Sequence, residues 1–140
     1  MKENALETID LELAVLLRRI TSSSRKIGHL DRSAYLLLYR IISNGPAGVK
    51  VLADEFQLDI STISRQTASL EQKGYVYRIQ DPADGRAYTL QITNLGKKEF
   101  YEHRVLRCER IGEVLKDWTD EESQVFGHLL RKYNQSSVKP

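Results

Sequence analysis

The sequence predicts a mainly α-helical protein that carries one small β-hairpin. Over most of the chain, apolar residues recur at three- and four-residue spacing, which places them on one face of a helix. The spacing changes to alternation in residues 75–80 and 88–92, as in strands. The intervening residues 81–86 contain Asp, Pro and Gly, which favour turns, so we expect the two strands to pair as an antiparallel hairpin.

The composition limits the classes of protein that fit. A chain of 140 residues suffices for one compact domain. Its 21 Lys and Arg against 19 Asp and Glu give a net charge of +2, so charge alone indicates neither nucleic-acid binding nor disorder. The single cysteine, Cys108, cannot form an intramolecular disulfide, and no apolar run approaches the roughly 20 residues that span a bilayer. We therefore expect a reduced, cytoplasmic protein that is held together by its apolar core and has no membrane partner.

Two helices are predicted within residues 6–44. Apolar residues from Leu6 to Ile20 form one stripe, and the weak helix formers in residues 21–24 are expected to end this helix before Gly28. The next helix should follow Asp31, whose carboxylate can accept hydrogen bonds from first-turn amides, and the Asn-Gly-Pro run at 44–46 should end it. The predicted buried face of this second helix consists of Ala34, Leu37, Leu38, Ile41 and Ile42.

The next two predicted helices are separated by a tight turn. The first is short, Val49–Phe56, and the turn lies at residues 57–58. The second is capped by Asp59, runs to about Lys73 and is ended by Gly74. Its apolar side is predicted to consist of Ile60, Ile63, Thr67 and Leu70.

The opposite side of the helix after Asp59 is small and polar and carries a single charge. Solvated helix faces usually carry Glu and Lys, whereas Ser, Thr, Gln and Arg suit phosphate oxygens and base edges. The second helix of a helix-turn-helix presents its N-terminal half to the major groove of DNA. An ordinary hydroxyl-rich surface is the alternative. The polar side consists of Ser61, Thr62, Arg65, Ser69 and Gln72, with Ser64 and Gln66 on its flanks.

The loop of the hairpin supplies a second signal. Asp84, Gly85 and Arg86 at its tip would project a guanidinium group beyond the globule, where it can enter a narrow minor groove. Taken alone, such a sequence is more often only a turn. Arg78 on the preceding strand is placed to contact a DNA backbone, with a solvated edge residue as the alternative.

The C-terminal part is predicted to form two more helices. The first, from Thr93, should run for about 25 residues, on the order of 37 Å, which is too long for its own domain to cover. The second should open with a capping box formed by Thr119 and Glu122. The apolar stripe of the first consists of Tyr101, Val105, Cys108, Ile111, Leu115 and Trp118, and that of the second of Phe126, Leu129, Leu130 and Tyr133.

Five segments in a fixed order carry a family resemblance. They are Gly48-Val-Lys-Val-Leu-Ala-Asp-Glu-Phe, Leu58-Asp-Ile-Ser-Thr-Ile-Ser-Arg-Gln, Leu70-Glu-Gln-Lys-Gly-Tyr-Val, Asp81-Pro-Ala-Asp-Gly-Arg and Leu90-Gln-Ile-Thr-Asn-Leu-Gly. Over residues 30–100 they resemble the winged helix-turn-helix core of the MarR family of bacterial transcription regulators. The sequence departs from the family pattern at Gly85, where the family often has an arginine, and at Val51, where it more often has a polar residue.

The resemblance implies one MarR-like domain over residues 1–140, with a winged helix-turn-helix DNA-binding core at 30–92 and helical dimerisation arms at 1–27 and 93–134. The implied homodimer places one recognition helix per chain in a major groove of double-stranded DNA and one wing in the adjoining minor groove. It also implies a repressor of a pseudo-palindromic operator that is released by a small aromatic or phenolic effector, with Tyr35, Tyr39 and His29 near that site. The DNA-binding residues expected from the residue pattern and the resemblance together are Ser61, Thr62, Ser64, Arg65, Gln66, Ser69, Arg78, Asp84 and Arg86.

Three other functions compete with DNA binding. A protein-binding winged helix is the first, but the polar face lacks aromatic and Met anchors. A thiol-based redox sensor is the second, although Cys108 falls in an apolar stripe and is expected to be a small buried residue. Catalysis is the third. His29, His103 and His128 lie in separate elements, and His103 is expected on a solvated, charged helix face, so we predict no enzyme, no metal and no cofactor.

Overall fold

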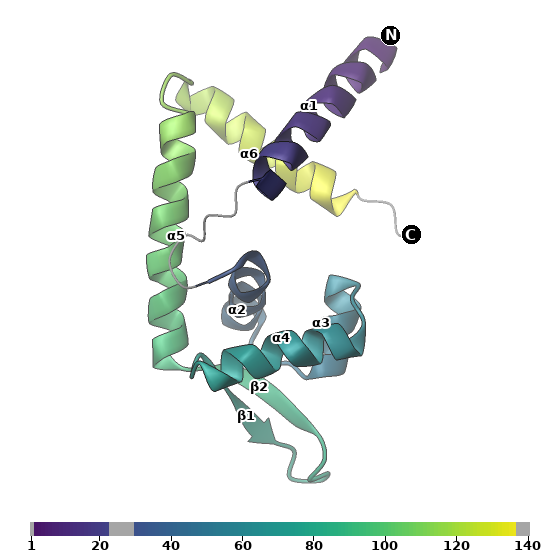
Figure 1. Ribbon diagram of the computed structural model, residues 1–140, viewed down its shortest axis with the longest axis vertical. Coiled ribbons are helices and arrows are strands. Elements are labelled where there is room, and N and C mark those ends of the chain that lie inside the picture. The colour runs from purple at the N-terminus through teal and green to yellow at the C-terminus, as the bar shows by residue number, and fades with distance from the viewer. Residues whose placement is uncertain (1, 23–29, 137–140) are drawn as a thin grey trace.

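The computed structural model describes residues 2–22 and 30–136, and it confirms a mainly helical fold with one antiparallel hairpin (Figure 1). Helices α2, α3 and α4 gather with the hairpin at one end of the molecule, and α5 runs from there to the other end, where α1 and α6 lie (Figure 1). The elements are α1 (Lys2–Ser22), α2 (Arg32–Asn44), α3 (Val49–Phe56), α4 (Ile60–Gln72), β1 (Val76–Gln80), β2 (Tyr88–Ile92), α5 (Asn94–Val114) and α6 (Asp120–Gln135).

Most helix boundaries follow the predicted capping signals. The Asp31 carboxylate accepts a hydrogen bond from the Ala34 amide at 2.8 Å, and Gly45 ends α2 with a φ of +84°. At the start of α6, the Thr119 hydroxyl and the Glu122 carboxylate each accept a hydrogen bond from the other residue's amide, so the predicted capping box is confirmed. Asp59 occupies the N-cap position of α4, but among the described residues its side chain makes no capping hydrogen bond.

One hydrophobic core joins α2, α3, α4, the hairpin and the first part of α5. Its largest fully buried side chains include Leu38, Leu52, Ile63 and Phe100. Tyr35, Ile42, Val49, Phe56 and Tyr88 pack against its edge. The core therefore fixes the two helices of the helix-turn-helix and the hairpin as one unit.

The face of α5 that enters this core differs from the predicted stripe. Gly96, Phe100 and His103 are buried, whereas Tyr101 and Val105 are exposed. At Gly96 a Cβ would lie 2.3 Å from the Tyr75 carbonyl oxygen, so only glycine lets α5 start this close to the hairpin. The helix ends at Val114, a few residues earlier than expected.

Two sequence predictions for α5 are wrong for the single chain. His103 is buried rather than solvated, because the α5 face that packs on α2 includes it, and its ring lies 4.9 Å from that of Tyr35. Cys108 is exposed rather than buried, because it belongs to the stripe that points away from the core. The expectation that this chain does not cover that stripe is met at the exposed residues Tyr101, Val105, Ile111 and Trp118.

The hairpin is extended by a third short segment. Its register pairs Val76 with Ile92 and Gln80 with Tyr88, and an isolated bridge pairs Ala47 with Leu90. The bridge attaches the segment before α3 to the wing. Only Val76 of β1 is buried, so alternation identified this strand correctly but not a buried face along it.

Helices α1 and α6 add little to the core. No residue of α6 is buried, and in the described part of α1 the most enclosed side chain, Leu13, is only half-buried. Among the described residues, none of the helices combines the length and apolar character that a membrane crossing requires.

Candidate nucleic-acid interface

Helix α4 presents one buried side and one polar side, as its sequence predicts. Ile63, Thr67 and Leu70 are buried, and the Thr67 hydroxyl donates to the Ile63 carbonyl at 2.9 Å, so its polar group is satisfied inside the core. Ile60 was expected on this side but is 50% exposed, because it lies at the first residue of the helix, beyond the edge of the core.

The predicted DNA-facing residues of α4 divide into two groups. Ser61, Arg65 and Ser69 are exposed, and the Arg65 guanidinium makes no ion pair with any described residue. Thr62, Ser64 and Gln66 are half-buried. Gln66 Nε2 donates to Ser33 Oγ on α2 at 3.2 Å, so the structure turns its amide toward the protein. Gln66 therefore also holds α4 against α2.

The turn between α3 and α4 is held by backbone hydrogen bonds. Gln57 adopts the left-handed region with a φ of +55°, and its amide donates to the Asp54 carbonyl at 3.2 Å. The Leu58 amide donates to the Ala53 carbonyl at 3.0 Å. A left-handed residue at this position fixes the direction in which α4 leaves α3.

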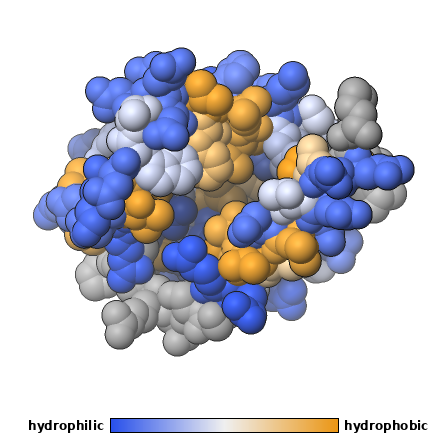
Figure 2. Space-filling view, turned by 90° about the horizontal axis from the view of Figure 1, so that it is seen from above, coloured by the Kyte–Doolittle hydropathy of each residue, from blue (hydrophilic) through white to orange (hydrophobic). Residues whose placement is uncertain are grey.

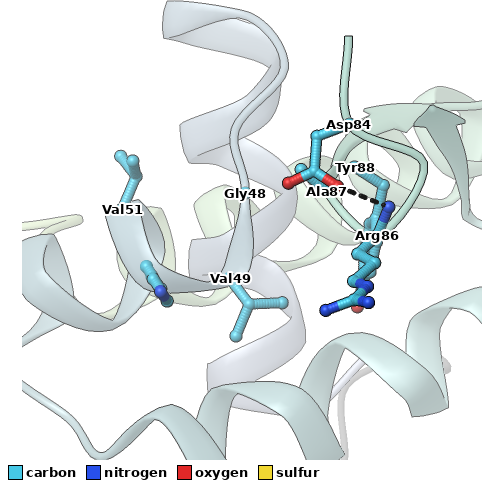
Figure 3. Close-up of a pocket in the computed structure, with 8 residues that line it drawn as sticks. Gly48, Val49, Val51, Asp84, Arg86, Ala87 and Tyr88 are labelled. Carbon is cyan, nitrogen blue, oxygen red and sulfur yellow. Dashed lines mark hydrogen bonds between the residues drawn. The ribbon is translucent and has the colours of Figure 1, made fainter. Parts of the chain in front are cut away.

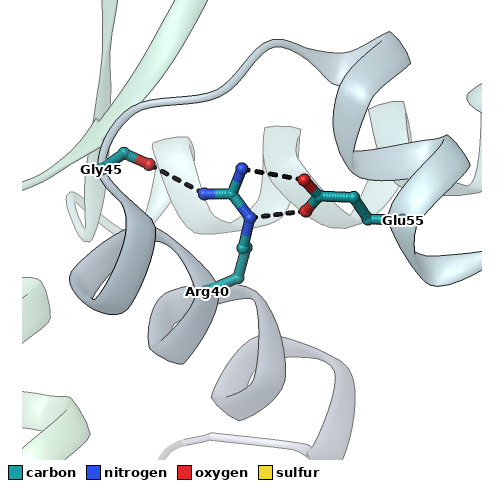
Figure 4. A network of polar contacts seen from close by, with 3 residues as sticks. All are labelled: Arg40, Gly45 and Glu55. Carbon is teal, nitrogen blue, oxygen red and sulfur yellow. Dashed lines mark hydrogen bonds and ion pairs between the residues drawn. The ribbon is translucent and has the colours of Figure 1, made fainter. Parts of the chain in front are cut away.

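An ion pair joins α2 to α3, the first helix of the helix-turn-helix (Figure 4). Arg40 contacts Glu55 through two parallel bonds, Nε to Oε2 at 2.5 Å and Nη2 to Oε1 at 3.0 Å, and Nη1 donates to the Gly45 carbonyl at 3.0 Å. The hydrogen bonds from Arg40 lower the pKa of Glu55, and the same contact raises the pKa of Arg40. Sequence reasoning missed this pair, since residues 15 positions apart share no local spacing signal.

The tip of the wing is shaped by its aspartates. The Asp84 carboxylate accepts a hydrogen bond from the Arg86 amide at 3.0 Å, and the Asp81 carboxylate accepts one from the Ala83 amide at 2.9 Å. Asp84 thus fixes the backbone of the turn. The Arg86 side chain is exposed, and its guanidinium makes no ion pair with any residue that the structure describes.

Arg78 links the wing to α4. Its Nε lies 3.0 Å from Glu71 Oε2 on α4, and its guanidinium carbon lies 4.1 Å from the centroid of the Tyr88 ring. Both partners belong to this chain. The structure therefore gives Arg78, which is exposed, a positioning contact within the molecule. Among the described residues, Arg65 and Arg86 are the arginines of the predicted set that make no ion pair.

A cleft of about 380 Å³ separates the start of α3 from the wing (Figure 3). The sequence predicts DNA binding for Asp84 and Arg86 of this lining but for no residue of α3, although Val51 stands out as an apolar residue without an assigned contact. Val51 is 50% exposed. The cleft is lined by Gly48, Val49, Lys50, Val51, Asp84, Arg86, Ala87 and Tyr88.

An aromatic and cationic cluster lies where α2 meets α5. The Tyr35 ring stacks on Phe100 at 4.9 Å, and its hydroxyl accepts a hydrogen bond from Arg104 Nε at 3.0 Å. The Arg104 guanidinium carbon lies 5.1 Å from the Tyr39 ring, and this hydrogen bond from Arg104 to Tyr35 raises the pKa of Arg104. Both predicted effector residues on α2 thus belong to this cluster, and His29 lies outside the described residues. No group of three or more metal-ligating side chains occurs in the described residues.

Comparisons with known proteins agree with this geometry. The model of the MarR family matches residues 30–88, which hold α2, α3, α4 and most of the wing. The chain is 43% identical over 139 residues to the uncharacterized HTH-type transcriptional regulator YxaD of Bacillus subtilis, covering 97% of each protein.

Solved structures extend the likeness to the whole chain at the level of the fold. A MarR family protein from Bacillus stearothermophilus superposes with a TM-score of 0.80 at 22% identity, covering 99% of both chains. FabT of Streptococcus pneumoniae, solved with DNA, gives 0.61 at 17% identity over 96% of this chain and 94% of FabT. PcaV of Streptomyces coelicolor, solved with its natural ligand, gives 0.64 at 22% over 94% and 91%. The chain belongs to the MarR family and is a DNA-binding transcription regulator with a winged helix-turn-helix fold.

Proposed function

We propose that this protein is a homodimeric repressor that binds a pseudo-palindromic DNA operator and is released by a small aromatic effector. The observation that carries the proposal is that α4, whose polar side is exposed or half-buried, and the exposed wing are held by one hydrophobic core. Figure 1 shows the two elements at the same end of the molecule. Two chemically different DNA-reading elements are thereby held at a fixed spacing. This arrangement suits a recognition helix in the major groove and a wing in the adjoining minor groove.

Two exposed arginines divide the work of recognition in this proposal. Arg65 lies within α4 and can reach base edges, while Arg86 lies at the wing and can reach the minor groove. Neither arginine has a charged partner among the described residues, so no ion pair of theirs in that part of the chain has to break when DNA binds. The remaining proposed contacts come from Ser61, Thr62, Ser64, Gln66, Ser69, Arg78 and Asp84.

The proposed dimer is supported by apolar side chains that this chain leaves exposed. Figure 2, which looks onto the end of the molecule that carries α1 and α6, shows hydrophobic residues around a hollow. Exposed hydrophobic side chains gathered at one end of a molecule are typical of a surface that a partner covers. We propose that the arms, residues 1–27 and 93–134, supply the covering surface of a second copy. The exposed residues include Leu6, Ile9, Leu16, Leu17, Ile111, Phe126, Leu129 and Leu130.

The proposed effector site is the aromatic cluster between α2 and α5. Tyr35 and Tyr39 offer ring surfaces, and Arg104 offers a cation beside them. A ligand there would act on the junction between the DNA-binding core and the long helix of the proposed arm. Its effect would be to change the spacing of the two recognition helices and lower operator affinity.

Fluorescence anisotropy on a duplex selected by the protein from a random-sequence library tests the DNA-binding part. We expect Arg65→Ala to reduce the preference for the selected duplex over a scrambled one, by the 1–3 kcal/mol typical of a base contact. Arg86→Ala should weaken both duplexes more evenly. Unchanged affinity and unchanged preference in both variants would contradict the proposed roles.

The exposure of Cys108 keeps one alternative open to experiment. An accessible thiol on α5 is compatible with a redox-sensing regulator. Peroxide treatment followed by the same anisotropy measurement distinguishes the two, with Cys108→Ser as control. The proposed repressor binds equally before and after treatment, whereas loss of binding that Cys108→Ser prevents would favour the thiol sensor.

A further inference from the structure

We propose that the cleft between the start of α3 and the wing seats one phosphate of the DNA backbone, held by Lys50 beside the minor groove that Arg86 enters. This inference rests on the proposed docking on DNA. It adds a positioning residue, Lys50, that neither the residue pattern of α4 nor the wing motif indicated.

The walls of the cleft are fixed before any ligand arrives. The Leu90 amide donates to the Ala47 carbonyl at 2.9 Å, and the Ala47 amide donates back at 3.4 Å. Immediately after this bridge, Gly48 lies so close to β2 that an added Cβ would be 3.2 Å from the Tyr88 carbonyl oxygen. The start of α3 and the base of the wing therefore cannot separate without breaking the bridge, so the cleft is preorganised.

The charges in the cleft favour an anion. Lys50 and Arg86 are both exposed, and neither makes an ion pair with any described residue. Asp84 is the carboxylate among the lining residues, and its Oδ1 already accepts the Arg86 amide at 3.0 Å. The lining residues thus carry a net charge of +1, from two cations and one anion.

The remaining lining residues match the part of DNA next to a phosphate. Val49, Val51 and Ala87 supply apolar side chains to the lining, and Figure 3 shows Val49 between α3 and Arg86. Each phosphate of a DNA strand is flanked by deoxyribose rings, whose carbons are apolar. A cationic rim with an apolar wall therefore fits the alternating chemistry of a sugar–phosphate backbone better than it fits a free inorganic anion.

The position of the cleft selects the same ligand. A protein that places α4 in a major groove and its wing in the adjoining minor groove straddles the strand between the two grooves. The cleft lies between the wing and α3, the helix that packs on α4. A phosphate held here would set the register of both reading elements without reading sequence itself.

The salt dependence of binding tests the proposal in the full-length protein. On the selected duplex, log affinity falls as log salt rises. Lys50→Gln should make this fall less steep, by about 0.9 in slope for each bound chain, because one fewer phosphate is neutralised. Preference over a scrambled duplex should stay unchanged, and Lys50→Arg should restore the slope. Lys116→Gln is the matched control, since Lys116 lies beyond the far end of α5 and pairs only with Glu113 among the described residues.

Replacing single DNA phosphates by neutral groups locates the phosphate that Lys50 contacts. Methylphosphonate groups are placed one at a time along the duplex, and wild type should lose affinity most where the cleft binds. At that position Lys50→Gln should lose less than wild type, because the contact is already gone. Far-UV circular dichroism shows whether the variants fold.

Two results would overturn the inference, and they differ in meaning. If wild type binds the selected duplex while Lys50→Gln and Lys116→Gln have equal slopes, the cleft holds no phosphate and the proposed function stands. If wild type prefers no duplex and instead binds an acidic peptide more tightly than Lys50→Gln does, the cleft serves a protein partner and the proposed function falls as well.

Discussion

The DNA-binding core and the helical arms of this chain differ in how they treat apolar residues. Helix α2 buries Ala34, Leu37, Leu38 and Ile41 within the chain. Helix α6 has a comparable apolar stripe but buries nothing. A core of this size is stable through such burial, at about 25 cal/mol per Å² of apolar surface. The comparison shows that the apolar side chains of the DNA-binding core are buried within the chain, whereas those of α6 are left exposed.

The largest expected effect on stability comes from truncating a leucine that is buried in the DNA-binding core. Leu38 is fully buried, so Leu38→Ala should lower the free energy of unfolding by about 2–5 kcal/mol, through lost burial and the cavity that remains. Leu129 on α6 is 52% exposed, so in a single chain Leu129→Ala should have little effect. Its effect should appear only through self-association and should grow with protein concentration.

Urea unfolding at a low and a high protein concentration measures both variants. The contrast between core and arms is contradicted if Leu38→Ala has the same free energy of unfolding as wild type. It is also contradicted if Leu129→Ala is as destabilising as Leu38→Ala at every concentration, since Leu129 would then be covered within its own chain.

A smaller effect is expected from the ion pair that braces α2 against α3. Arg40 is 14% exposed and Glu55 is 39% exposed, so we expect about 1 kcal/mol or less from this partly screened pair. Arg40 lowers the pKa of Glu55 below its ordinary value of 4.5. Its contribution is therefore complete above about pH 4.5 and is lost as the pH falls through the lowered value in the folded state.

Thermal unfolding between neutral and acidic pH separates this pair from general acid effects. Glu55→Gln should lose stability at neutral pH and lose less than wild type on acidification. Glu113→Gln is the control in the C-terminal arm, because the Glu113–Lys116 pair is far more exposed, and it should follow wild type at every pH. An identical pH profile for wild type and Glu55→Gln would show that the brace adds no stability.

Local signals were sufficient to predict most elements. The bounds of α3, the cap at Asp31 and the box of Thr119 and Glu122 depend on residues a few positions apart. The polar side of α4 was predicted for the same reason. Sequence spacing was therefore enough for these features, although the local signals also predicted a cap by Asp59 and a buried Ile60, neither of which is found in the part of the chain that the structure describes.

Contacts between distant segments could not be predicted. Gln66 bonds Ser33 at a separation of 33 residues, and Arg104 bonds Tyr35 at 69. Helix α5 carries apolar residues on two sides, and periodicity does not say which side faces the core of its own chain. The stripe through Tyr101 and Val105 was recognised, while the packed side with Phe100 and His103 was not.

Sedimentation velocity on the full-length chain, alone and with a selected duplex, tests the central claim most directly. The account predicts a dimer at micromolar concentration and two chains on one duplex, with recognition helices about one helical turn, or roughly 34 Å, apart. A stable monomer in solution that binds the duplex as one chain would contradict it, because the exposed faces of α1, α5 and α6 would then need no second copy.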